Sequence, residues 1–493
     1  MRKPLRDVIL LAVGFLAVLS LAGEATAGRC ATGLRGAKSG RFEPVRPLPR
    51  QKAYRLPEMS VQETPVPFRN GAAALTRHFR LIWGQDYPAS DPDWADADEN
   101  GQPDWVDAAG EVFEQAYQEF MALGLPAPYG SDTYFLDVYF ANTGLEVCSR
   151  ETYDPQSTPP EKRCQTELGP GEWVKVELDQ SYYAYTEIDT DYGVAYFIFS
   201  DDFSLHTDDE VAVLRATAAH ELFHAVQRAL GYPWDDEVRI PEIRWQDEMW
   251  WFEATATWME EVVAPDVDDY VTYVRKFLAA PQEPLAGTGG LREYGASIFA
   301  GYLWLRYGAQ DLWIDVFSHA FAKGLEPALR AALVARSAPS LEDVVAAFWS
   351  LAAHPEDFWA DGAQFRTSSA PRLVRSAATL PLAYATSAAT APGRFGANLV
   401  SVEYAPASVG AEFAPVSPGS ARIAVSGAGD EGVTVAELVS GSNVVETGSA
   451  GGGLYIAVVN TSGTDGDMAY SIEFTSESTS GGGCFISTLR PGP

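Results

Sequence analysis

Histidine, cysteine and basic residues are scarce in this chain of 493 residues. It contains six histidines, four cysteines and 35 lysines and arginines, against 67 aspartates and glutamates, so the formal net charge is −32. Such an excess of negative charge repels the phosphates of nucleic acids and anionic membrane surfaces. We therefore expect neither as a partner, and the composition favours solubility and cation binding.

Long apolar runs are missing after the amino terminus. Residues 1–27 combine a basic start, an apolar segment from Ile9 to Leu21 and small residues before Gly28, which is the pattern of a secretory signal. The apolar segment is shorter than the about 20 residues that span a bilayer. We expect an exported protein, extracellular or periplasmic, without a membrane span. Attachment to the cell surface through the C-terminal region stays open.

The few cysteines give two expectations. Cys148 and Cys164 lie in one Pro- and charge-rich loop, and in an oxidising compartment their pairing contributes about 3 kcal/mol. In the tail, Gly481 to Ser487 resembles a Gly-rich, Cys-Phe-Ile sorting box of some exported bacterial proteins. Processing at Cys484 and a bond between Cys30 and Cys484 are alternatives.

The scarcity of histidine draws attention to His220-Glu221-Leu222-Phe223-His224. On an α-helix, residues i and i+4 share one face, so both imidazoles can reach one ion. Glu221 lies about a third of a turn away, within reach of a water on that ion. Imidazole and carboxylate ligands with one open position suit a catalytic zinc, which predicts Glu221 as the general base.

A third protein ligand is needed, and Glu253 is predicted to supply it. This residue lies in an aromatic-rich helical run from Trp250 to Glu261 and is flanked by apolar residues. Glu260 follows seven residues later on the same helical face and is expected to orient a ligand.

The surroundings specify the metal-binding helix. Thr207 and Glu210 form a capping-box pattern at its start, and Gly231 with Pro233 ends it. Upstream, residues 192–200 predict a strand whose edge is free to pair with an extended peptide.

These two stretches resemble the gluzincin pattern, and the second is similar to the Trp-x-x-Glu-Gly-x-Ala-x-Trp-x-Glu run of aminopeptidase-N-like zinc peptidases. Ala254 stands where the family has glycine, and a loop over residues 232–247 accounts for a longer spacing. The resemblance implies that Glu253 is the third zinc ligand. The matching positions are Trp250, Glu253, Ala256, Trp258 and Glu260.

A third stretch, Arg292 to Phe299, resembles the family's Tyr-x-Lys-Gly-Ala segment, whose tyrosine stabilises the oxyanion. The resemblance implies this role for Tyr294, with His319 as the alternative. The Gly-x-Met-Glu-Asn segment, which holds the substrate amino terminus in those aminopeptidases, is absent. More broadly, the chain looks like secreted bacterial metalloproteases that combine such helices with an acidic calcium-type loop.

The acidic loop itself spans residues 96–107 and follows the EF-hand code, with Gly101 at the sharp turn. Pro88 and Pro92 interrupt the incoming side, so we expect a lone loop that holds one structural Ca²⁺ and adds stability and protease resistance. The predicted ligands are Asp96, Asp98, Asn100, Gln102 through its carbonyl, Asp104 and Asp107.

The fold class predicted is α+β, a zincin-like catalytic domain of mixed sheet, active-site helices and a helical second half, followed by a small all-β sandwich. Near Ala370 the composition shifts to Ala, Ser, Gly, Val and Thr, and residues 454–460 and 470–474 predict a hairpin. The predicted divisions are a signal peptide (1–27), a lead-in or removable pro-segment (28–72), the metallopeptidase domain (73–368), the β-sandwich (369–478) and a Gly/Cys tail (479–493).

The sequence therefore predicts a secreted zinc metallopeptidase that hydrolyses protein or peptide substrates. The missing amino-terminus anchor favours an endopeptidase. Two alternatives stay open, an aminopeptidase and a calcium-stabilised surface or adhesion protein with an inactive zincin site.

Overall fold

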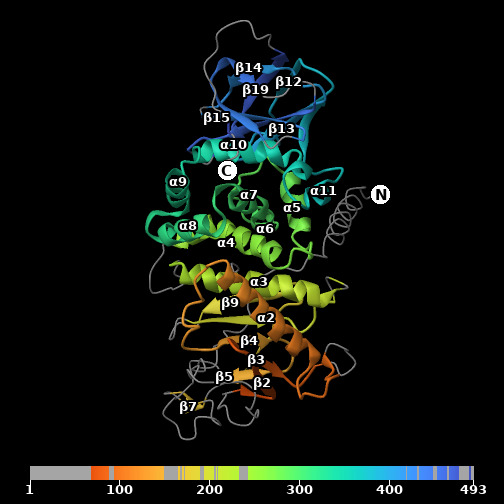
Figure 1. Ribbon diagram of the computed structural model, residues 1–493, viewed down its shortest axis with the longest axis vertical. Coiled ribbons are helices and arrows are strands. Elements are labelled where there is room, and N and C mark those ends of the chain that lie inside the picture. Colours follow the sequence, from red (N-terminus) through yellow and green to blue (C-terminus); the bar gives the residue numbers. More distant parts are fainter. Residues whose placement is uncertain are drawn as a thin grey trace, which may run out of the picture.

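The computed structural model describes residues 68–476 and 488–489, except for gaps at 88–93, 149–164, 167–168, 171–172, 189–193, 205–206, 208, 232–241, 418, 430–431, 448–451 and 464–465. These residues form an elongated molecule with a sheet region at one end, helices in the middle and a β-sandwich at the other end (Figure 1). The expected mixed α+β class with a later all-β region is therefore confirmed. The predictions for the signal segment and for all four cysteine side chains lie outside the described residues.

A five-stranded mixed sheet forms the first region, in the order β2-β3-β4-β10-β9. The three central strands are parallel, and each edge strand is antiparallel to its neighbour. All three central strands are buried, and the two charged residues among them, Arg80 of β3 and Asp137 of β4, form an ion pair with each other. The strands are β2 (Gly71–Leu75), β3 (Phe79–Gly84), β4 (Leu136–Phe140), β10 (Ala195–Phe199) and β9 (Ala184–Ile188).

Two details of this region differ from expectation. The strand expected over residues 192–200 is β10, and it lies inside the sheet, so the edge strand on that side is β9. Regular structure also begins inside the segment expected as a lead-in, because β2 starts at Gly71 and β1 (Phe68–Arg69) precedes it. Short strands complete the region: β5 (Glu146–Cys148) and β8 (Trp173–Lys175), which form a small sheet with β1, and β6 (Gln165–Thr166), paired with β7 (Gly169–Pro170).

Two long helices pack against this sheet, α2 (Asp104–Ala122) and α3 (Glu210–Ala229) (Figure 1). The cap of α3 differs from the predicted capping box. Asp209 is the N-cap, and its side chain accepts from the backbone N–H of Ala212 at 3.2 Å. The Glu210 carboxylate accepts instead from the N–H of Phe203, which ties the incoming loop to the helix start.

Helix α4 (Glu242–Val263) lies directly against α3 and begins the helical middle region (Figure 1). Its start at Glu242 shows that residues 242–247 are helical rather than part of the expected loop. The remaining helices are α5 (Val271–Ala279), α6 (Arg292–Gly295), α7 (Ser297–Tyr307), α8 (Ala309–Lys323), α9 (Leu325–Ala335), α10 (Leu341–Ala352), the 3₁₀ helix η4 (Pro355–Asp357) and α11 (Gly362–Phe365).

The β-sandwich consists of a six-stranded sheet, β11-β13-β18-β15-β16-β20, and a four-stranded sheet, β12-β19-β14-β17. Its strands are β11 (Leu373–Ala377), β12 (Leu382–Ala385), β13 (Ala397–Val402), β14 (Ser408–Pro415), β15 (Ala421–Gly427), β16 (Val433–Leu438), β17 (Gly441–Glu446), β18 (Leu454–Asn460), β19 (Tyr470–Ser476) and β20 (Thr488–Leu489).

The sandwich is not an independent appendage. Helix α10 packs across the outer face of the six-stranded sheet, and Leu399, Ala424 and Val459 belong to the same core as the buried residues of α3 and α4. The predicted hairpin is wrong, because β18 pairs with β13 and β15 whereas β19 pairs with β12 and β14 in the other sheet. The Gly- and Asp-rich connection crosses between the sheets.

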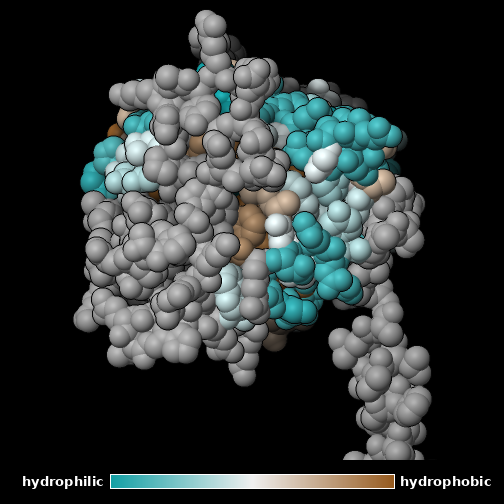
Figure 2. Space-filling model, turned by 90° about the horizontal axis from the view of Figure 1, so that it is seen from below, coloured by the Kyte–Doolittle hydropathy of each residue, from teal (hydrophilic) through white to brown (hydrophobic). Residues whose placement is uncertain are grey.

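Seen from the end of the five-stranded sheet, the described surface is mostly hydrophilic, with a small hydrophobic area near its centre (Figure 2). Within the described ranges, no helix combines the length and the apolar character that a bilayer crossing requires.

Candidate metal centre

Two neighbouring helices bring three predicted ligands together. Nε2 of His220 lies 3.2 Å from Oε2 of Glu253, and Nε2 of His224 lies 3.6 Å from the same oxygen. All three residues are buried, and their ligand atoms lie within 4.8 Å of one another. The i and i+4 spacing places the histidines on one face of α3, and the packing of α3 against α4 adds the carboxylate.

The other nitrogen of the first histidine is held by α4. Nδ1 of His220 lies 2.6 Å from Oε1 of Glu260, a buried carboxylate two turns after Glu253. With a cation on Nε2, the His220 ring would keep its proton on Nδ1 and donate it to this carboxylate. Such a partner fixes both the tautomer and the ring orientation of a metal-binding histidine.

A second network orients the other histidine. Nδ1 of His224 lies 2.9 Å from Oε1 of Gln227, and Nε2 of Gln227 donates to the carbonyl of Phe252 and to Oγ1 of Thr255, both at 3.0 Å. Because the amide nitrogen has these acceptors, its oxygen faces His224 and accepts the Nδ1 proton. Nε2 of His224 therefore also presents a lone pair.

The convergence of His220, His224 and Glu253 would be explained electrostatically by a bound cation. Two imidazole lone pairs and a carboxylate oxygen face one another in a buried space, and a cation stabilises that arrangement. Ligands about 2.0–2.1 Å from a tetrahedral zinc lie about 3.3 Å apart. The separations of 3.2 and 3.6 Å match this spacing, so the donor set fits Zn²⁺ in chemistry and geometry.

The pKa values of Glu253 and Glu260 are shifted in opposite directions. Burial acts to raise the pKa of Glu253, but attraction to protonated His224 and His220 and the hydrogen bonds that these rings then donate outweigh burial and lower the pKa to about 2. Burial and the nearby charges of Glu221 and Glu253 raise the pKa of Glu260, against the hydrogen bond from His220. The oxygen that faces both Nε2 atoms therefore belongs to the stronger acid, which stays an anion.

The predicted general base, Glu221, is buried beside the ligands and touches the edge strand. Oγ1 of Thr186 in β9 lies 2.5 Å from Oε2 of Glu221 and 2.9 Å from its backbone carbonyl oxygen. This contact ties the helix that carries the histidines to the strand at the edge of the sheet.

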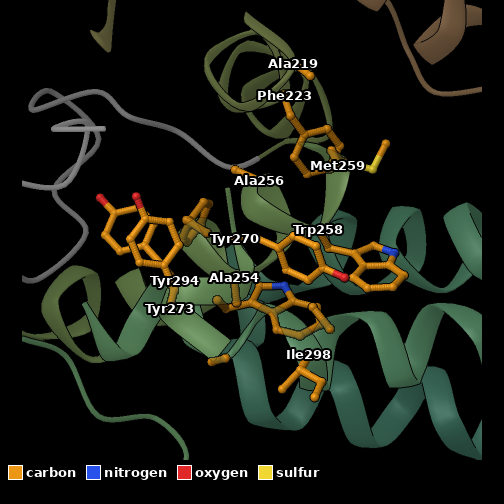
Figure 3. Packing of buried hydrophobic residues seen from close by; sticks show 14 of the residues in the cluster. Ala219, Phe223, Ala254, Ala256, Trp258, Met259, Tyr270, Tyr273, Tyr294 and Ile298 are labelled. Carbon is orange, nitrogen blue, oxygen red and sulfur yellow. The ribbon is translucent and has the colours of Figure 1, made fainter. Parts of the chain in front are cut away.

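Tyr294 lies next to the first histidine. Its ring centroid is 6.0 Å from that of His220 and 5.4 Å from that of Tyr273 of α5. Figure 3 shows the two tyrosine rings side by side with their hydroxyls directed to the same side. Gly295 permits this close approach, because a Cβ there would come within 2.5 Å of the Tyr273 carbonyl oxygen.

The alternative oxyanion residue, His319, is exposed on α8, and its Nδ1 lies 2.7 Å from the carbonyl oxygen of Asp315 in the same helix. It therefore does not belong to the buried cluster.

The acidic loop gathers three of its predicted carboxylates. Oxygens of Asp98, Asp104 and Asp107 lie within 4.8 Å of one another. Gly101 takes φ +91°, as the sharp turn of an EF-hand loop requires. Partial burial, with the charges of Asp98, Asp104 and Asp96, raises the pKa of Asp107 against a hydrogen bond from Asn100.

Asp96 and Asn100, two of the predicted calcium ligands, form hydrogen bonds within the loop. Both carboxylate oxygens of Asp96 accept backbone N–H groups, from Asn100 and Gly101, at 2.9 Å. The amide nitrogen of Asn100 donates to Asp98 at 3.1 Å and to Asp107 at 2.8 Å. Ligation of a cation through the oxygen of Asn100 requires this amide to turn by half a rotation. The backbone N–H of Gln102 donates to Oδ1 of Asn100 at 2.8 Å.

Comparison of the sequence with protein-family models and with curated proteins finds no match in either set.

Sequence reasoning missed Gln227 and Thr186 as members of the site. A signal existed for Gln227, which follows His224 by three residues and thus shares its helical face. No local signal pointed to Thr186, because it reaches the site from a separate strand.

Proposed function

We propose that this protein is a zinc metallopeptidase of the gluzincin type, with a zincin-like catalytic region. The observation that carries the proposal is the convergence of Nε2 of His220, Nε2 of His224 and Oε2 of Glu253, at the spacing of a zinc tetrahedron. Each histidine is oriented through its Nδ1, by Glu260 and Gln227, so that Nε2 faces the shared space.

The chemistry divides among these residues. His220, His224 and Glu253 would hold the zinc, which would supply Lewis acidity that lowers the pKa of water toward neutrality. Glu221 accepts the proton of the attacking water and later passes it to the departing amine nitrogen. Tyr294 donates to the oxygen of the scissile carbonyl as negative charge develops there.

The substrate is a protein or an extended peptide. An antiparallel edge strand such as β9 offers backbone donors and acceptors to such a chain. An endopeptidase is favoured, because the chain lacks the segment that anchors a substrate amino terminus in the aminopeptidases it resembles. Export through residues 1–27 belongs to the same proposal.

We also propose that the loop over residues 96–107 binds one structural Ca²⁺. The support is the cluster of Asp98, Asp104 and Asp107 around a turn with Gly101 in the required conformation. A cation there offsets the mutual repulsion of the carboxylates.

The test is metal analysis and proteolysis on the same samples of the purified protein. We expect about one zinc per wild-type chain and little in His220→Ala. Glu221→Gln is expected to retain zinc and to lose about 10²–10⁴-fold in casein hydrolysis, since it removes the proton acceptor. A wild-type protein without zinc, or a Glu221→Gln variant as active as the wild type, would contradict the proposal.

Peptide substrates separate the alternatives. An endopeptidase cleaves peptides with a blocked amino terminus, whereas an aminopeptidase requires the free amine. A protein that binds zinc but gives the same casein digest before and after Glu221→Gln is instead the surface or adhesion protein with an inactive site.

A further inference from the structure

Thr186 forms a contact that links the edge of the sheet to the centre of the site. Its hydroxyl lies 2.5 Å from Oε2 of Glu221 and 2.9 Å from the Glu221 carbonyl oxygen. The threonine is 2% exposed and the glutamate is fully buried. A carbonyl oxygen and an ionised carboxylate only accept, so the threonine is the donor, and its single proton is shared between the two oxygens, with the shorter contact to Oε2.

The strand explains why this side chain points to the helix. Successive side chains of β9 alternate between faces, and Ala184 and Thr186 are buried while Glu187 is exposed. Thr186 pairs with Phe197 of β10 in register, which fixes its height along the strand. Threonine is also stiff about χ1, so its hydroxyl has few other directions.

We propose that Thr186 is a positioning residue that holds the carboxylate of Glu221 for proton transfer. This inference rests on the proposed function. The hydroxyl holds Oε2 and thereby sets the direction of the whole carboxylate. The second contact, to the carbonyl of the same residue, keeps the hydroxyl at that point of α3. The side chain that accepts the proton is thus oriented by the strand that offers its edge to the peptide.

The physical effect is one of geometry. A glutamate side chain has several rotatable bonds, and reaction requires one orientation in which its oxygen meets the water. A hydrogen bond to one carboxylate oxygen selects that orientation before substrate arrives. Misplacement of a reacting group by about 1 Å lowers the rate up to about a hundredfold, so loss of the hydroxyl affects turnover more than substrate binding.

The test compares Thr186→Val, Thr186→Ser and Thr434→Val in the zinc-loaded protein. Valine keeps the shape and removes the hydroxyl, serine restores it, and Thr434 of β16 is a buried threonine in the sandwich. For Thr186→Val we expect kcat to fall about tenfold to a hundredfold, with KM within twofold and zinc content unchanged. Thr186→Ser should recover at least a third of the wild-type kcat. Thr434→Val should leave kcat unaltered.

A second measurement does not depend on activity. In the metal-free protein, the shift in the urea unfolding midpoint caused by Thr186→Val is measured in the wild type and in Glu221→Ala. We expect a smaller shift in Glu221→Ala, because the partner of the hydroxyl is already gone. Equal shifts in the two backgrounds show no coupling between the residues and overturn the inference.

The kinetic outcomes separate this inference from the proposed function. Full activity of Thr186→Val beside an inactive Glu221→Gln overturns the role of Thr186 alone. A parallel loss of zinc in Thr186→Val also overturns it, since the residue then supports the metal site instead of the base. Equal activity of the wild type and Glu221→Gln overturns both.

Discussion

Oε1 of Glu260 lies 2.6 Å from Nδ1 of His220, although forty positions separate the two residues in the chain. This hydrogen bond joins α4 to α3 beside the three candidate ligands. Helix α4 thus supplies both Glu253, a candidate ligand, and Glu260, the partner of the candidate ligand His220.

We therefore expect Glu260→Gln to lower zinc affinity about tenfold to a hundredfold, as loss of such partners does elsewhere. The amide can still accept the Nδ1 proton of His220 but no longer carries a charge. Competition with a chromophoric chelator measures the affinity. Asp266→Asn, which changes an exposed ion pair with Arg215, is the control. An affinity within twofold of the wild type for Glu260→Gln would show that the carboxylate is dispensable.

Glu261, which follows Glu260 on α4, predicts a pH effect on stability. Burial, together with the charges of Asp361, Asp268 and Glu260, raises the pKa of Glu261 from 4.5 to about 8. Between these values the folded protein holds a proton that the unfolded chain has released. The free energy of unfolding therefore decreases as pH rises from 4.5 to about 8.

Glu261→Gln removes this dependence. Because the side chain is partly exposed, we expect a gain of only about 1 kcal/mol at pH 8 and little change at pH 4.5. Urea unfolding at the two pH values checks this, with Glu119→Gln on the exposed side of α2 as the control. Equal effects of Glu261→Gln at both pH values would show that the carboxyl titrates normally.

His354 predicts the opposite pH trend where the helical region meets the sandwich. Its Nδ1 lies 2.9 Å from Oδ2 of Asp357, and its Nε2 lies 2.7 Å from Oγ of Ser426 in β15. Burial lowers the pKa of His354, a change that Asp357 and Glu356 oppose and Arg366 assists. The unfolded chain takes up a proton below pH 6.5, which the folded state resists, so stability is lost as pH falls below that value.

His354→Gln breaks the buried network, and we expect it to lower the unfolding free energy by about 2–3 kcal/mol at pH 7.5. At pH 5 the difference from the wild type should be smaller than at pH 7.5, because the variant has no imidazole to protonate. Denaturant titrations at both pH values give the two differences. A difference that grows on acidification contradicts the assignment.

The acidic loop predicts stabilisation by calcium. Addition of Ca²⁺ at a hundred times its dissociation constant should raise the unfolding free energy by about 2.7 kcal/mol and slow digestion by trypsin. Asp98→Asn should abolish the response, whereas Asp132→Asn, on an exposed residue outside the loop, should preserve it. The same calcium response in Asp98→Asn and the wild type would place the effect elsewhere.

The carboxylates of Glu260 and Glu221 bond to residues far away in the chain, His220 and Thr186, and such pairs are not predictable from the sequence. A helix or a tight loop fixes the relative positions of residues a few places apart in the chain. Short spacings therefore predict that His220 and His224 share a helical face, that the chain turns at Gly101, and where most helices lie. The capping of α3 already departs from the pattern, because Glu210 bonds to the preceding loop rather than to its own helix.

The sequence by itself determined the local chemistry, two histidines and a glutamate on one helix and an acidic loop ahead of another. Only the tertiary structure decided that Glu260 contacts His220 and that Thr186 contacts Glu221. It also decided that β9 lies at the edge of its sheet and that β18 and β19 belong to different sheets. These contacts join residues far apart in the chain, where no helical or strand period sets a distance. Packing of whole elements brings them together.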